Sequence, residues 1–408
     1  MSMDIDGLIK AEETRQEETI TLIPSENYTS KAVRSALSSK LVNKYSEGYS
    51  GRRYYQGNKI IDEIETAAVE NAKKLFGTPH ANVQPYSGSP ANSAVFFGLL
   101  NVGDTIMGLS LASGGHLTHG HPRITFSGKY FNSVQYEVGE DGLIDYNRVK
   151  SLAKANKPKL IVAGTTAYSR ILEWEKFAEI ADSVGAILLA DISHIAGLVV
   201  AGVHPSPVKY AHVVTTTTHK TLRGPRGAMV MVTQKGLDFD PEMNKKVDRA
   251  VFPGLQGGPH NNQTAAIAIA LAEASTKEFK SYGKQVVENA GVLSSELSNY
   301  GFNIVSGGTD NHLMLVDLRP KNILGKDAAI LLEEAGIVTN YNAIPFDPNP
   351  PMNPSGLRIG TPAITTRGMG VVEVKQIASW INFVLSKQVD PIQIAQQVSK
   401  LCSKFKTP

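Results

Sequence analysis

A single lysine, Lys220, stands where an apolar, β-branched segment ends and a loop begins. Residues 213–216 are typical of a strand, and Gly224-Pro225 is typical of a loop. Thr217 and His219 place uncharged polar groups beside the amine. In such surroundings a lysine can lose its proton and attack a carbonyl carbon, forming a Schiff base. Most single lysines are solvated surface residues, so this chemistry needs support from other residues.

An aspartate, Asp191, closes the apolar run at residues 188–190 in the same way. A carboxylate there can pair with the protonated ring nitrogen of pyridoxal phosphate, an electron sink. Alone, the residue could equally cap a following helix. His194 could lie against the phenolic oxygen of the cofactor or complete a turn. Asp191 and Lys220 are 29 positions apart, room for one helix and one strand, which predicts that both lie at one edge of a parallel sheet.

A candidate phosphate site occurs at Ser87-Gly88-Ser89. This turn points backbone N–H groups and two hydroxyls at one spot, before a helix whose predicted first residue is Pro90. The helix dipole favours an anion there. Such a turn alone is usually a helix cap, and its spacing differs from that of nucleotide-binding loops. Together with Asp191 and Lys220, it predicts a pyridoxal phosphate site.

Composition limits the class of protein. The 408 residues suffice for two domains, and the net charge of +3 offers no footprint for nucleic acid. Cys402 is the only cysteine, so we expect no disulfide and no metal site. The acidic N-terminus is unlike a targeting peptide, and no apolar run is long enough to span a membrane. We therefore expect a soluble, cytoplasmic protein.

Short apolar runs alternate with helical patterns from about residue 60 to 235. This alternation predicts an α/β fold with a mostly parallel sheet and helices on both faces. A second alternation predicts a smaller α+β domain. We expect an N-terminal arm and a large domain at residues 1–275, and a small C-terminal domain at residues 276–408. Strands are expected at residues 105–109, 133–136, 160–162, 187–189, 213–216, 228–232, 303–308, 312–318 and 355–361, and the main helices at residues 60–76, 173–184, 262–272, 280–300, 328–335, 373–385 and 391–404.

Several longer strings occur together and in order. They lie at residues 23–27, 43–55, 114–120, 191–197, 213–227, 254–259 and 358–362. In these strings the chain resembles the serine hydroxymethyltransferase family over nearly its whole length. The resemblance implies a fold-type I pyridoxal phosphate transferase with a seven-stranded sheet. It also implies reversible interconversion of serine and glycine, in which serine displaces Lys220 to form an external aldimine and its hydroxymethyl carbon passes to a reduced pterin.

The resemblance assigns cofactor contacts. Lys220, with Thr217 beside it, would carry the cofactor, Asp191 would hold the ring nitrogen, and His116 would cover the ring. Arg226 would lower the pKa of Lys220 by like charge. Thr166 stands where many relatives have serine and keeps the hydroxyl. The cofactor-binding residues would be Ser87, Gly88, Ser89, His116, Thr166, Asp191, His194, His219 and Lys220, with Tyr45 and Gly258 reaching the phosphate from a neighbouring subunit.

The resemblance also assigns substrate contacts. Arg358 would clamp the substrate carboxylate and so orient the bonds at the α-carbon. Ser25, and Tyr55 of a neighbouring subunit, would complete that pocket. Glu47 would be the general acid–base at the reacting hydroxymethyl group, with a pKa raised by the cleft. Because residues from two subunits would form one site, we expect at least a homodimer, and a tetramer stays open.

The pterin contacts implied are Leu111, Gly114, Gly115, Leu117 and Asn342. Phe346 lies in a proline-rich loop nearby. We favour a role in packing that loop, and a changed pterin pocket is the alternative. The pterin could therefore be tetrahydrofolate or a modified pterin such as tetrahydromethanopterin.

Two other functions share part of this pattern. A pyridoxal phosphate aldolase acting on threonine or allo-threonine would use the same Lys220, Asp191 and Arg358, but the segment around Glu47 and the Gly114-Gly-His116 stretch argue against it. A non-catalytic or RNA-binding relative would be expected to lack Lys220, Asp191 or Arg358. All three are present.

Overall fold

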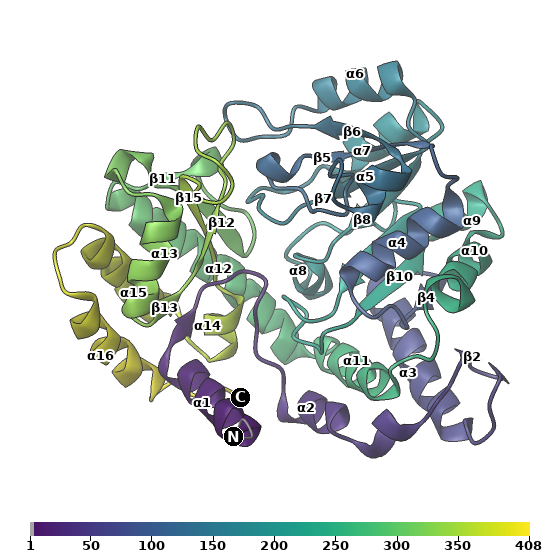
Figure 1. Ribbon diagram of the computed structural model, residues 1–408, viewed down its shortest axis with the longest axis horizontal. Coiled ribbons are helices and arrows are strands. Elements are labelled where there is room, and N and C mark those ends of the chain that lie inside the picture. Colours follow the sequence, from purple (N-terminus) through teal and green to yellow (C-terminus); the bar gives the residue numbers. More distant parts are fainter. Residues whose placement is uncertain (1–3) are drawn as a thin grey trace.

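A seven-stranded sheet forms the centre of the larger lobe in the computed structural model, which describes residues 4–408 (Figure 1). The strand order is β4-β10-β9-β8-β7-β5-β6. Strand β10 is antiparallel to both of its neighbours, and all other pairs are parallel. The expected mostly parallel α/β sheet is confirmed. Its strands are β4 (His80–Asn82), β5 (Thr105–Leu109), β6 (Asn132–Tyr136), β7 (Leu160–Gly164), β8 (Ile187–Asp191), β9 (Val213–Thr217) and β10 (Ala228–Val232).

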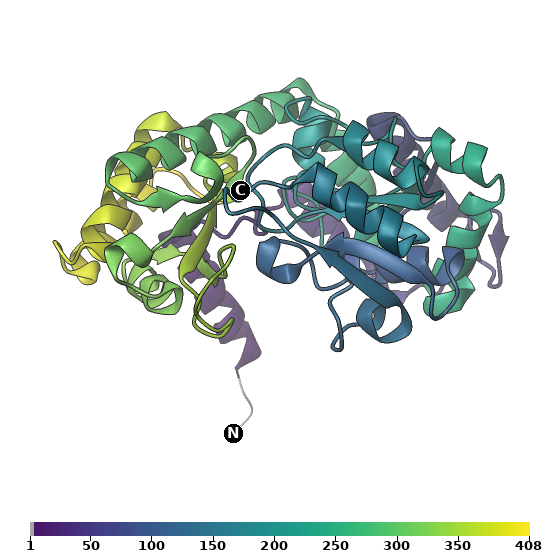
Figure 2. The same ribbon diagram turned by 90° about the horizontal axis from the view of Figure 1, so that it is seen from above.

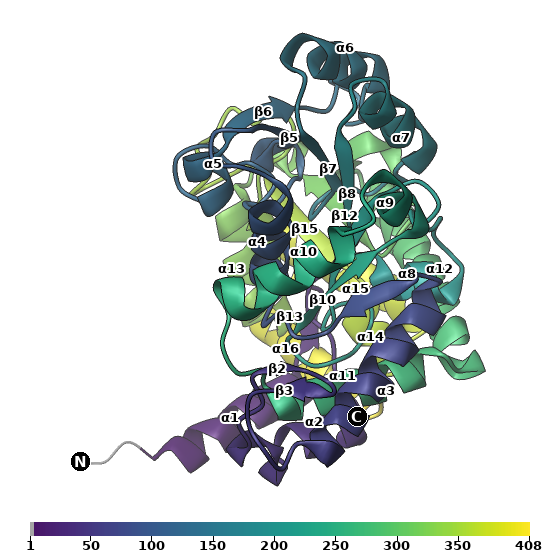
Figure 3. The ribbon, with the colours of Figure 1, turned by 90° about the vertical axis from the view of Figure 1, so that its right-hand side faces the viewer.

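Both faces of this sheet are covered, as continuous apolar strands require. Along β7, Ile161 and Ala163 belong to one hydrophobic core, whereas Leu160 and Val162 belong to another on the opposite face. Figure 3 shows helices on either side of the strands. The helices of this lobe are α3 (Lys59–Phe76), α4 (Gly88–Leu99), α5 (Phe126–Tyr130), α6 (Tyr146–Asn156), α7 (Trp174–Asp182), α8 (Ala196–Ala201), α9 (Gln234–Phe239), α10 (Met243–Arg249) and α11 (Asn261–Ala274).

The smaller lobe has its own antiparallel sheet, in the order β11-β12-β15-β14. The strands are β11 (Asn303–Ile304), β12 (Leu313–Asp317), β14 (Asn340–Asn342) and β15 (Gly356–Gly360). The helices are α13 (Gly325–Glu334), α14 (Pro362–Thr366), α15 (Val371–Leu385) and α16 (Pro391–Cys402). Seen from above in Figure 2, the two lobes lie side by side.

Helix α12 (Lys277–Asn299) joins the lobes. Phe279 and Val286 pack into the core of the large lobe, and Ala290 and Leu297 pack into that of the small lobe. The predicted boundary at residues 275/276 falls just before this helix and stays a prediction, because α12 serves both cores.

An N-terminal arm was expected at the start of the large domain, but its helices and strands were not predicted. It contains α1 (Ile5–Glu18), β1 (Ile20–Thr21), α2 (Lys31–Leu37), a 3-10 turn (Lys40–Asn43), β2 (Gly48–Tyr49) and β3 (Arg52–Arg53). Strand β1 pairs with β13 (Ile337–Val338), which places Ile20 in the core of the small lobe. The arm therefore runs along both lobes before α3 begins (Figure 1).

Several predicted bounds were wrong. Helix α4 begins at Gly88, so Pro90 is its third residue rather than its first. The strand predicted at residues 303–308 ends after Ile304, because Ser306 and Gly307 have φ angles of 61° and 73° and turn the chain. Within residues 4–408, no helix has the length and apolar character needed to cross a membrane.

Candidate active site

A cavity of about 510 Å³ lies at the carboxyl ends of β7, β8 and β9, with both lobes and the N-terminal arm in its wall. This is the edge of an open α/β sheet where ligands usually bind. Most of the predicted site residues line it, together with Arg226: Ser25, Ser87, Gly88, Ser89, Leu111, Gly115, His116, Leu117, Thr166, Asp191, His194, Thr217, His219, Lys220, Asn342 and Arg358.

Lys220 follows the last residue of β9 by three positions, and its amine points back to that strand. Its Nζ donates a hydrogen bond of 2.8 Å to Thr217 Oγ1. Burial, and then the like charges of Arg226 and Arg358, lower the pKa of Lys220 to about 8, against an opposing effect of Asp191. The expected contribution of Arg226 is confirmed, although burial is the larger cause. Such an amine has a substantial neutral, nucleophilic fraction near pH 8.

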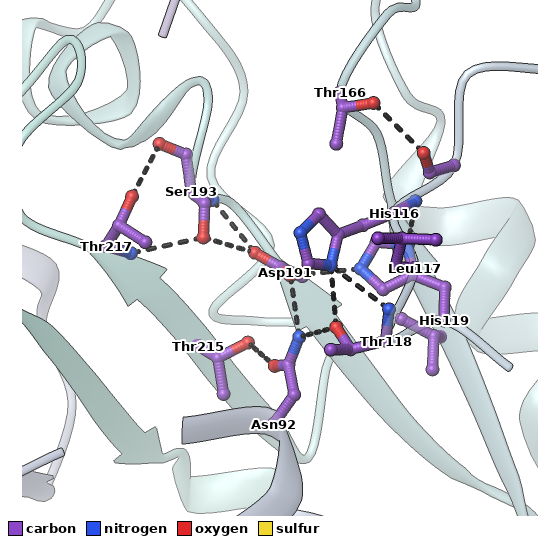
Figure 4. Close-up of polar contacts among 12 residues, drawn as sticks. Asn92, His116, Leu117, Thr118, His119, Thr166, Asp191, Ser193, Thr215 and Thr217 are labelled. Atoms are coloured by element: carbon purple, nitrogen blue, oxygen red, sulfur yellow. Dashed lines mark hydrogen bonds and ion pairs between the residues drawn. The ribbon is translucent and has the colours of Figure 1, made fainter. Parts of the chain in front are cut away.

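Asp191 ends β8 directly beside β9 and is held as a carboxylate. Oδ2 accepts hydrogen bonds from His119 (3.0 Å) and Asn92 (2.9 Å), and Oδ1 accepts from the backbone N–H and hydroxyl of Ser193 (3.1 and 2.6 Å) (Figure 4). Burial alone would raise the pKa of Asp191, but these bonds hold it well below its usual range. The side chain therefore keeps its negative charge and can face a protonated ring nitrogen.

The tautomer of His119 follows from its contacts. Its Nδ1 accepts the backbone N–H of His116 (3.2 Å), so a neutral ring carries its proton on Nε2 and donates it to Asp191. The ring of His116 lies in front of this pair (Figure 4). Its Nδ1 accepts the N–H of Thr118 (3.1 Å), and burial lowers the pKa of His116 to about 4. At neutral pH His116 therefore presents an uncharged aromatic face to the cavity.

The start of helix α4 fits a phosphate. Ser87 is the N-cap, and its hydroxyl makes no capping bond to the helix. A Cβ atom at Gly88 would lie 2.8 Å from Thr217 Cγ2, so only glycine lets the turn approach β9 this closely. In the wall of the same cavity, His219 Nδ1 is buried without a partner among the described residues, and burial lowers the pKa of His219 to about 3. Free hydroxyls, helix N–H groups and one orphaned ring nitrogen suit a phosphate group.

Arg358 enters the cavity from the centre of the small sheet, on β15. Its Nη1 donates to Thr166 O (2.8 Å) and its Nε donates to Asn340 Oδ1 (3.2 Å). Burial lowers the pKa of Arg358 to about 10, so the guanidinium stays charged at neutral pH. The hydroxyl of Thr166 donates to Gly115 O (3.0 Å), and its backbone N–H donates to the carbonyl oxygen of the predicted pterin contact Gly114 (2.7 Å). A fixed cation facing Lys220 suits a carboxylate.

His194 is buried at the inner wall and does more than complete a turn. Its Nδ1 lies 3.2 Å from Nε2 of His312, with the two rings stacked. Burial lowers the pKa of His194 well below its usual range. This contact joins the two lobes behind the cavity.

Four predicted residues gather elsewhere. The rings of Tyr45 and Tyr55 lie 5.2 Å apart, Tyr45 Oη donates to Glu47 Oε1 (3.4 Å), and a Cβ atom at Gly258 would touch the Tyr45 ring. Among the described residues that line the Lys220 cavity, none of these four occurs. Tyr45 and Tyr55 are 55% and 45% exposed. The four residues thus form a second cluster within one chain, in which the two tyrosines are exposed and Glu47 and Gly258 are half-buried.

The favoured interpretation of Phe346 was wrong. Its side chain is 59% exposed, so it does not pack the loop that carries it. The turn there is held instead by Asp347, which accepts bonds from Ser355 N and Oγ (2.8 and 2.7 Å).

Sequence reasoning missed the residues that hold the catalytic groups in place. Asn92 bridges Asp191, Thr118 and Thr215 from inside helix α4, and His119 and Ser193 complete the carboxylate's contacts. A signal existed for Asn92, because it is a polar residue one turn into an apolar helix directly after the phosphate turn. His119 lies in the string at residues 114–120, but the resemblance assigned no role to this histidine.

A mainly parallel seven-stranded sheet with this lysine, aspartate and phosphate turn at its carboxyl edge defines a fold-type I pyridoxal phosphate enzyme. Comparison with known proteins narrows the class. The family model for serine hydroxymethyltransferase matches residues 1–381. The serine hydroxymethyltransferase of Acidothermus cellulolyticus is 55% identical, over 99% of this chain and 95% of that protein.

Two further relatives agree. The serine hydroxymethyltransferases of Desulfotalea psychrophila and Sorangium cellulosum are each 55% identical over 99% of this chain, covering 94% and 95% of their own lengths. The chain belongs to the serine hydroxymethyltransferase family. It is a pyridoxal phosphate-dependent transferase of serine–glycine interconversion and one-carbon metabolism. Nothing in these relatives supports a dedicated aldolase.

Proposed function

We propose that this chain interconverts serine and glycine at the Lys220 cavity and passes the hydroxymethyl carbon of serine to a reduced pterin. One observation carries the assignment of the site. Lys220, Asp191 and Arg358 come from two lobes and three strands or strand ends, yet all face one cavity. A covalent anchor, a ring-nitrogen partner and a carboxylate clamp are the three groups that an amino-acid-transforming pyridoxal phosphate site needs.

The cofactor would be held at both ends. Ser87, Gly88, Ser89 and His219 would bind its phosphate, and Asp191 its ring nitrogen. Bound pyridoxal phosphate supplies an electron-withdrawing ring that accepts the electron pair released at the α-carbon of the substrate. The observations that support the fit are the unused Ser87 hydroxyl, the close approach at Gly88 and the orphaned His219 Nδ1.

The protein's own groups hold protons in a defined pattern. Lys220, with a pKa near 8, can accept a proton from the substrate ammonium and later return one at the α-carbon. Thr217 Oγ1 receives the Lys220 hydrogen bond and so fixes the amine when it is free. His116 stays neutral, so it covers the ring without adding charge.

Arg358 would bind the substrate carboxylate, with Ser25 beside it. Its guanidinium plane is fixed by Thr166 and Asn340, so a bidentate carboxylate could sit in only one orientation. That orientation decides which bond of the α-carbon stands perpendicular to the cofactor ring, and therefore which bond breaks.

A second copy of the chain would complete each site. Tyr45, Glu47, Tyr55 and Gly258 lie together on an exposed surface outside the Lys220 cavity, which supports their action in the site of the partner. Tyr45 and Gly258 would contact the phosphate, Tyr55 the carboxylate, and Glu47 would exchange a proton at the hydroxymethyl group. A homodimer is then the smallest active unit.

The pterin would enter beside Leu111, Gly115, Leu117 and Asn342, which line the cavity, with Gly114 directly behind them. Because Phe346 is exposed, the alternative interpretation of this residue, a changed pterin pocket, is retained. Tetrahydrofolate and a modified pterin such as tetrahydromethanopterin are therefore both candidates.

Serine labelled with carbon-13 at its β-carbon tests the proposal directly by NMR. We expect the label to move to the pterin and unlabelled glycine to appear only when tetrahydrofolate or tetrahydromethanopterin is added. Glu47→Gln should slow this transfer by about 10²–10⁴-fold, whereas Glu63→Gln, on the exposed face of α3, should not. Threonine cleavage without any pterin-dependent glycine formation would contradict the proposal and favour an aldolase.

A further inference from the structure

The backbone immediately after Lys220 is held in an unfavourable conformation. Lys220 O accepts a hydrogen bond from Arg223 N (3.1 Å), closing a tight turn. Arg223 itself has a φ angle of 60°, in the left-handed region that a side-chain-bearing residue rarely adopts. Such a conformation persists only where surrounding contacts enforce it.

Helix α12 supplies the first of those contacts. The Arg223 guanidinium carbon lies 4.2 Å from the centre of the Tyr282 ring and 5.1 Å from that of Phe279. Both rings are buried, so the cation–π contact is shielded from water. The side chain of Arg223 is thereby fixed to α12, and the left-handed turn is fixed with it.

Asn27, on the N-terminal arm, holds the other end of the same turn. Its Nδ2 donates to Lys220 O (3.0 Å) and to Tyr282 Oη (2.8 Å), while its Oδ1 accepts from Thr366 Oγ1 (2.7 Å) and Tyr28 N (2.9 Å). These four bonds use the hydrogen-bonding capacity of the amide in full. The turn, α12, the arm and the small lobe therefore meet at one side chain.

We propose that Asn27, Arg223 and Tyr282 act as positioning residues, a turn clamp that fixes the backbone of Lys220 and so places its amine within the cavity. Tyr282 joins both halves of the clamp, since its hydroxyl contacts Asn27 and its ring contacts Arg223. This inference rests on the proposed role of Lys220 as the covalent anchor and goes beyond it, because none of the three residues contacts the amine itself.

The amine would respond to loss of the clamp because its surroundings are charged and asymmetric. Asp191 attracts the ammonium form from the end of β8, whereas Arg226 and Arg358 repel it from a loop and from β15. His116, His194 and His219 face the same space as neutral rings. A backbone shift of about 1 Å is enough to disturb a catalytic geometry. Once the turn relaxes, the flexible lysine side chain can reach water, and burial no longer lowers its pKa.

The test measures the pKa of Lys220 in the full-length chain prepared without pyridoxal phosphate. Trace acylation at a series of pH values, read by mass spectrometry of the Lys220 peptide, gives the labelling midpoint. We expect this midpoint near pH 8 in the unaltered protein. In Asn27→Ala it should rise by about one pH unit or more, toward the ordinary lysine value.

Two further variants separate positioning from simple loss of stability. Asn289→Ala is the matched control, because the Asn289 amide, on α12, also joins two elements, and it is bonded to Thr365 Oγ1 (2.9 Å) and Met369 O (3.0 Å) away from Lys220. It should lower the melting temperature and leave the labelling midpoint unchanged. Tyr282→Phe keeps the ring under Arg223 and removes only the hydroxyl. It should therefore shift the labelling midpoint upward by less than Asn27→Ala does. If Asn27→Ala does not fold, Tyr282→Phe alone tests the clamp.

An unchanged midpoint in the folded clamp variants would overturn the turn clamp. That outcome is distinct from failure of the proposed function. The proposed function fails if the unaltered protein does not attach pyridoxal phosphate to Lys220, whatever the variants do.

Discussion

At the scale of single residues, the site depends on where protons are held. Asp191 keeps its charge because four donors surround it, and His119 is one of the two that reach Oδ2. Each donor stabilises the carboxylate, and together they outweigh the cost of its burial. If Asp191 pairs with the ring nitrogen of the cofactor as proposed, the affinity of the site for the cofactor depends on the residues that hold this carboxylate.

His119→Phe tests this dependence. Hydrogen bonds to charged groups contribute about 1.5–3 kcal/mol, so we expect the dissociation constant of pyridoxal phosphate to rise by about 10- to 100-fold. Fluorescence titration measures it. Gln135→Ala is the control, since Gln135 contacts the backbone carbonyl of His119 but not the carboxylate. Equal affinity in His119→Phe and the unaltered protein would refute the role of this donor.

The buried pair His194 and His312 makes a pH prediction. Burial, and then the charge of Arg358, lowers the pKa of His312 to about 3, and that of His194 is also well below its usual range. An unfolded histidine titrates near 6.5, so below that pH the unfolded chain binds protons that the folded chain does not. Stability is thus complete above about pH 6.5 and falls as the pH drops.

We expect the free energy of unfolding to fall by about 1.4 kcal/mol per pH unit for each of these histidines below about pH 6. Urea unfolding at several pH values measures the slope. His312→Asn should reduce this slope by about 1.4 kcal/mol per pH unit, the contribution of one histidine. His260→Asn, on the surface, should leave the slope unchanged. A slope that is the same in His312→Asn as in the unaltered protein would be inconsistent with a neutral buried pair.

Residue types and spacing predicted that Lys220 and Asp191 lie at one edge of the sheet, and the structure places both in one cavity with residues 87–89, because those residues sit at the junctions between regular elements. The residues that hold them were not predictable in the same way. Asn92 and His119 act through contacts across 99 and 72 positions of sequence with Asp191, and no local pattern encodes such distances.

At the scale of elements, the segment that carries Glu47 is held by Arg53. Nη1 of Arg53 donates to the carbonyls of Ser46 (2.9 Å) and Gly48 (2.8 Å), one on each side of Glu47. Its Nε donates to Asp62 Oδ1 (2.8 Å), and Nη2 forms an ion pair with Glu65 Oε2 at 3.1 Å. Helix α3 thus supplies two carboxylates that fix the arginine, and the arginine fixes the β2–β3 hairpin.

Arg53→Met should remove this support and leave Glu65 buried without a counter-charge. Breaking a buried ion pair in this way costs about 3–5 kcal/mol, which urea unfolding can measure. Arg15→Met removes an exposed partner of Glu12 on α1 and should cost less than about 1 kcal/mol. A loss in Arg53→Met as small as that in Arg15→Met would show that the ion pair does not hold the hairpin.

Regular elements with a strong local pattern were predicted well. Helix α3 ends at Phe76, as predicted, and Gly77 caps it with a left-handed φ angle of 74°. The helix and strand of the N-terminal arm were not predicted, because α1 buries none of its residues and β1 has only two residues, so neither carries a periodic signal. Strand β1 exists through its pairing with β13, about 317 positions along the chain.

At the scale of the whole molecule, one chain holds two separate groups of predicted site residues. The Lys220 cavity lacks Glu47, and the Glu47 cluster lies on another surface. If two copies exchange these clusters, a mixed dimer of Lys220→Ala and Glu47→Gln chains contains one site with both defects and one with neither.

Such mixing gives a quantitative prediction. An equal mixture, unfolded and refolded together, should recover about one quarter of the activity of the unaltered protein, since half of the dimers would be mixed and each would have one intact site. Each variant refolded alone is the control and should stay inactive. No recovery in a mixture that forms dimers would place Glu47 and Lys220 in the site of the same chain.

The central claim is that Lys220 is the group to which pyridoxal phosphate attaches. Borohydride reduction of the full-length protein with the cofactor, followed by digestion and mass spectrometry, identifies the modified lysine. We predict a pyridoxyl group on the peptide carrying Lys220, and its loss in Lys220→Arg. A pyridoxyl group on a different lysine, with Lys220 unmodified, would contradict the account.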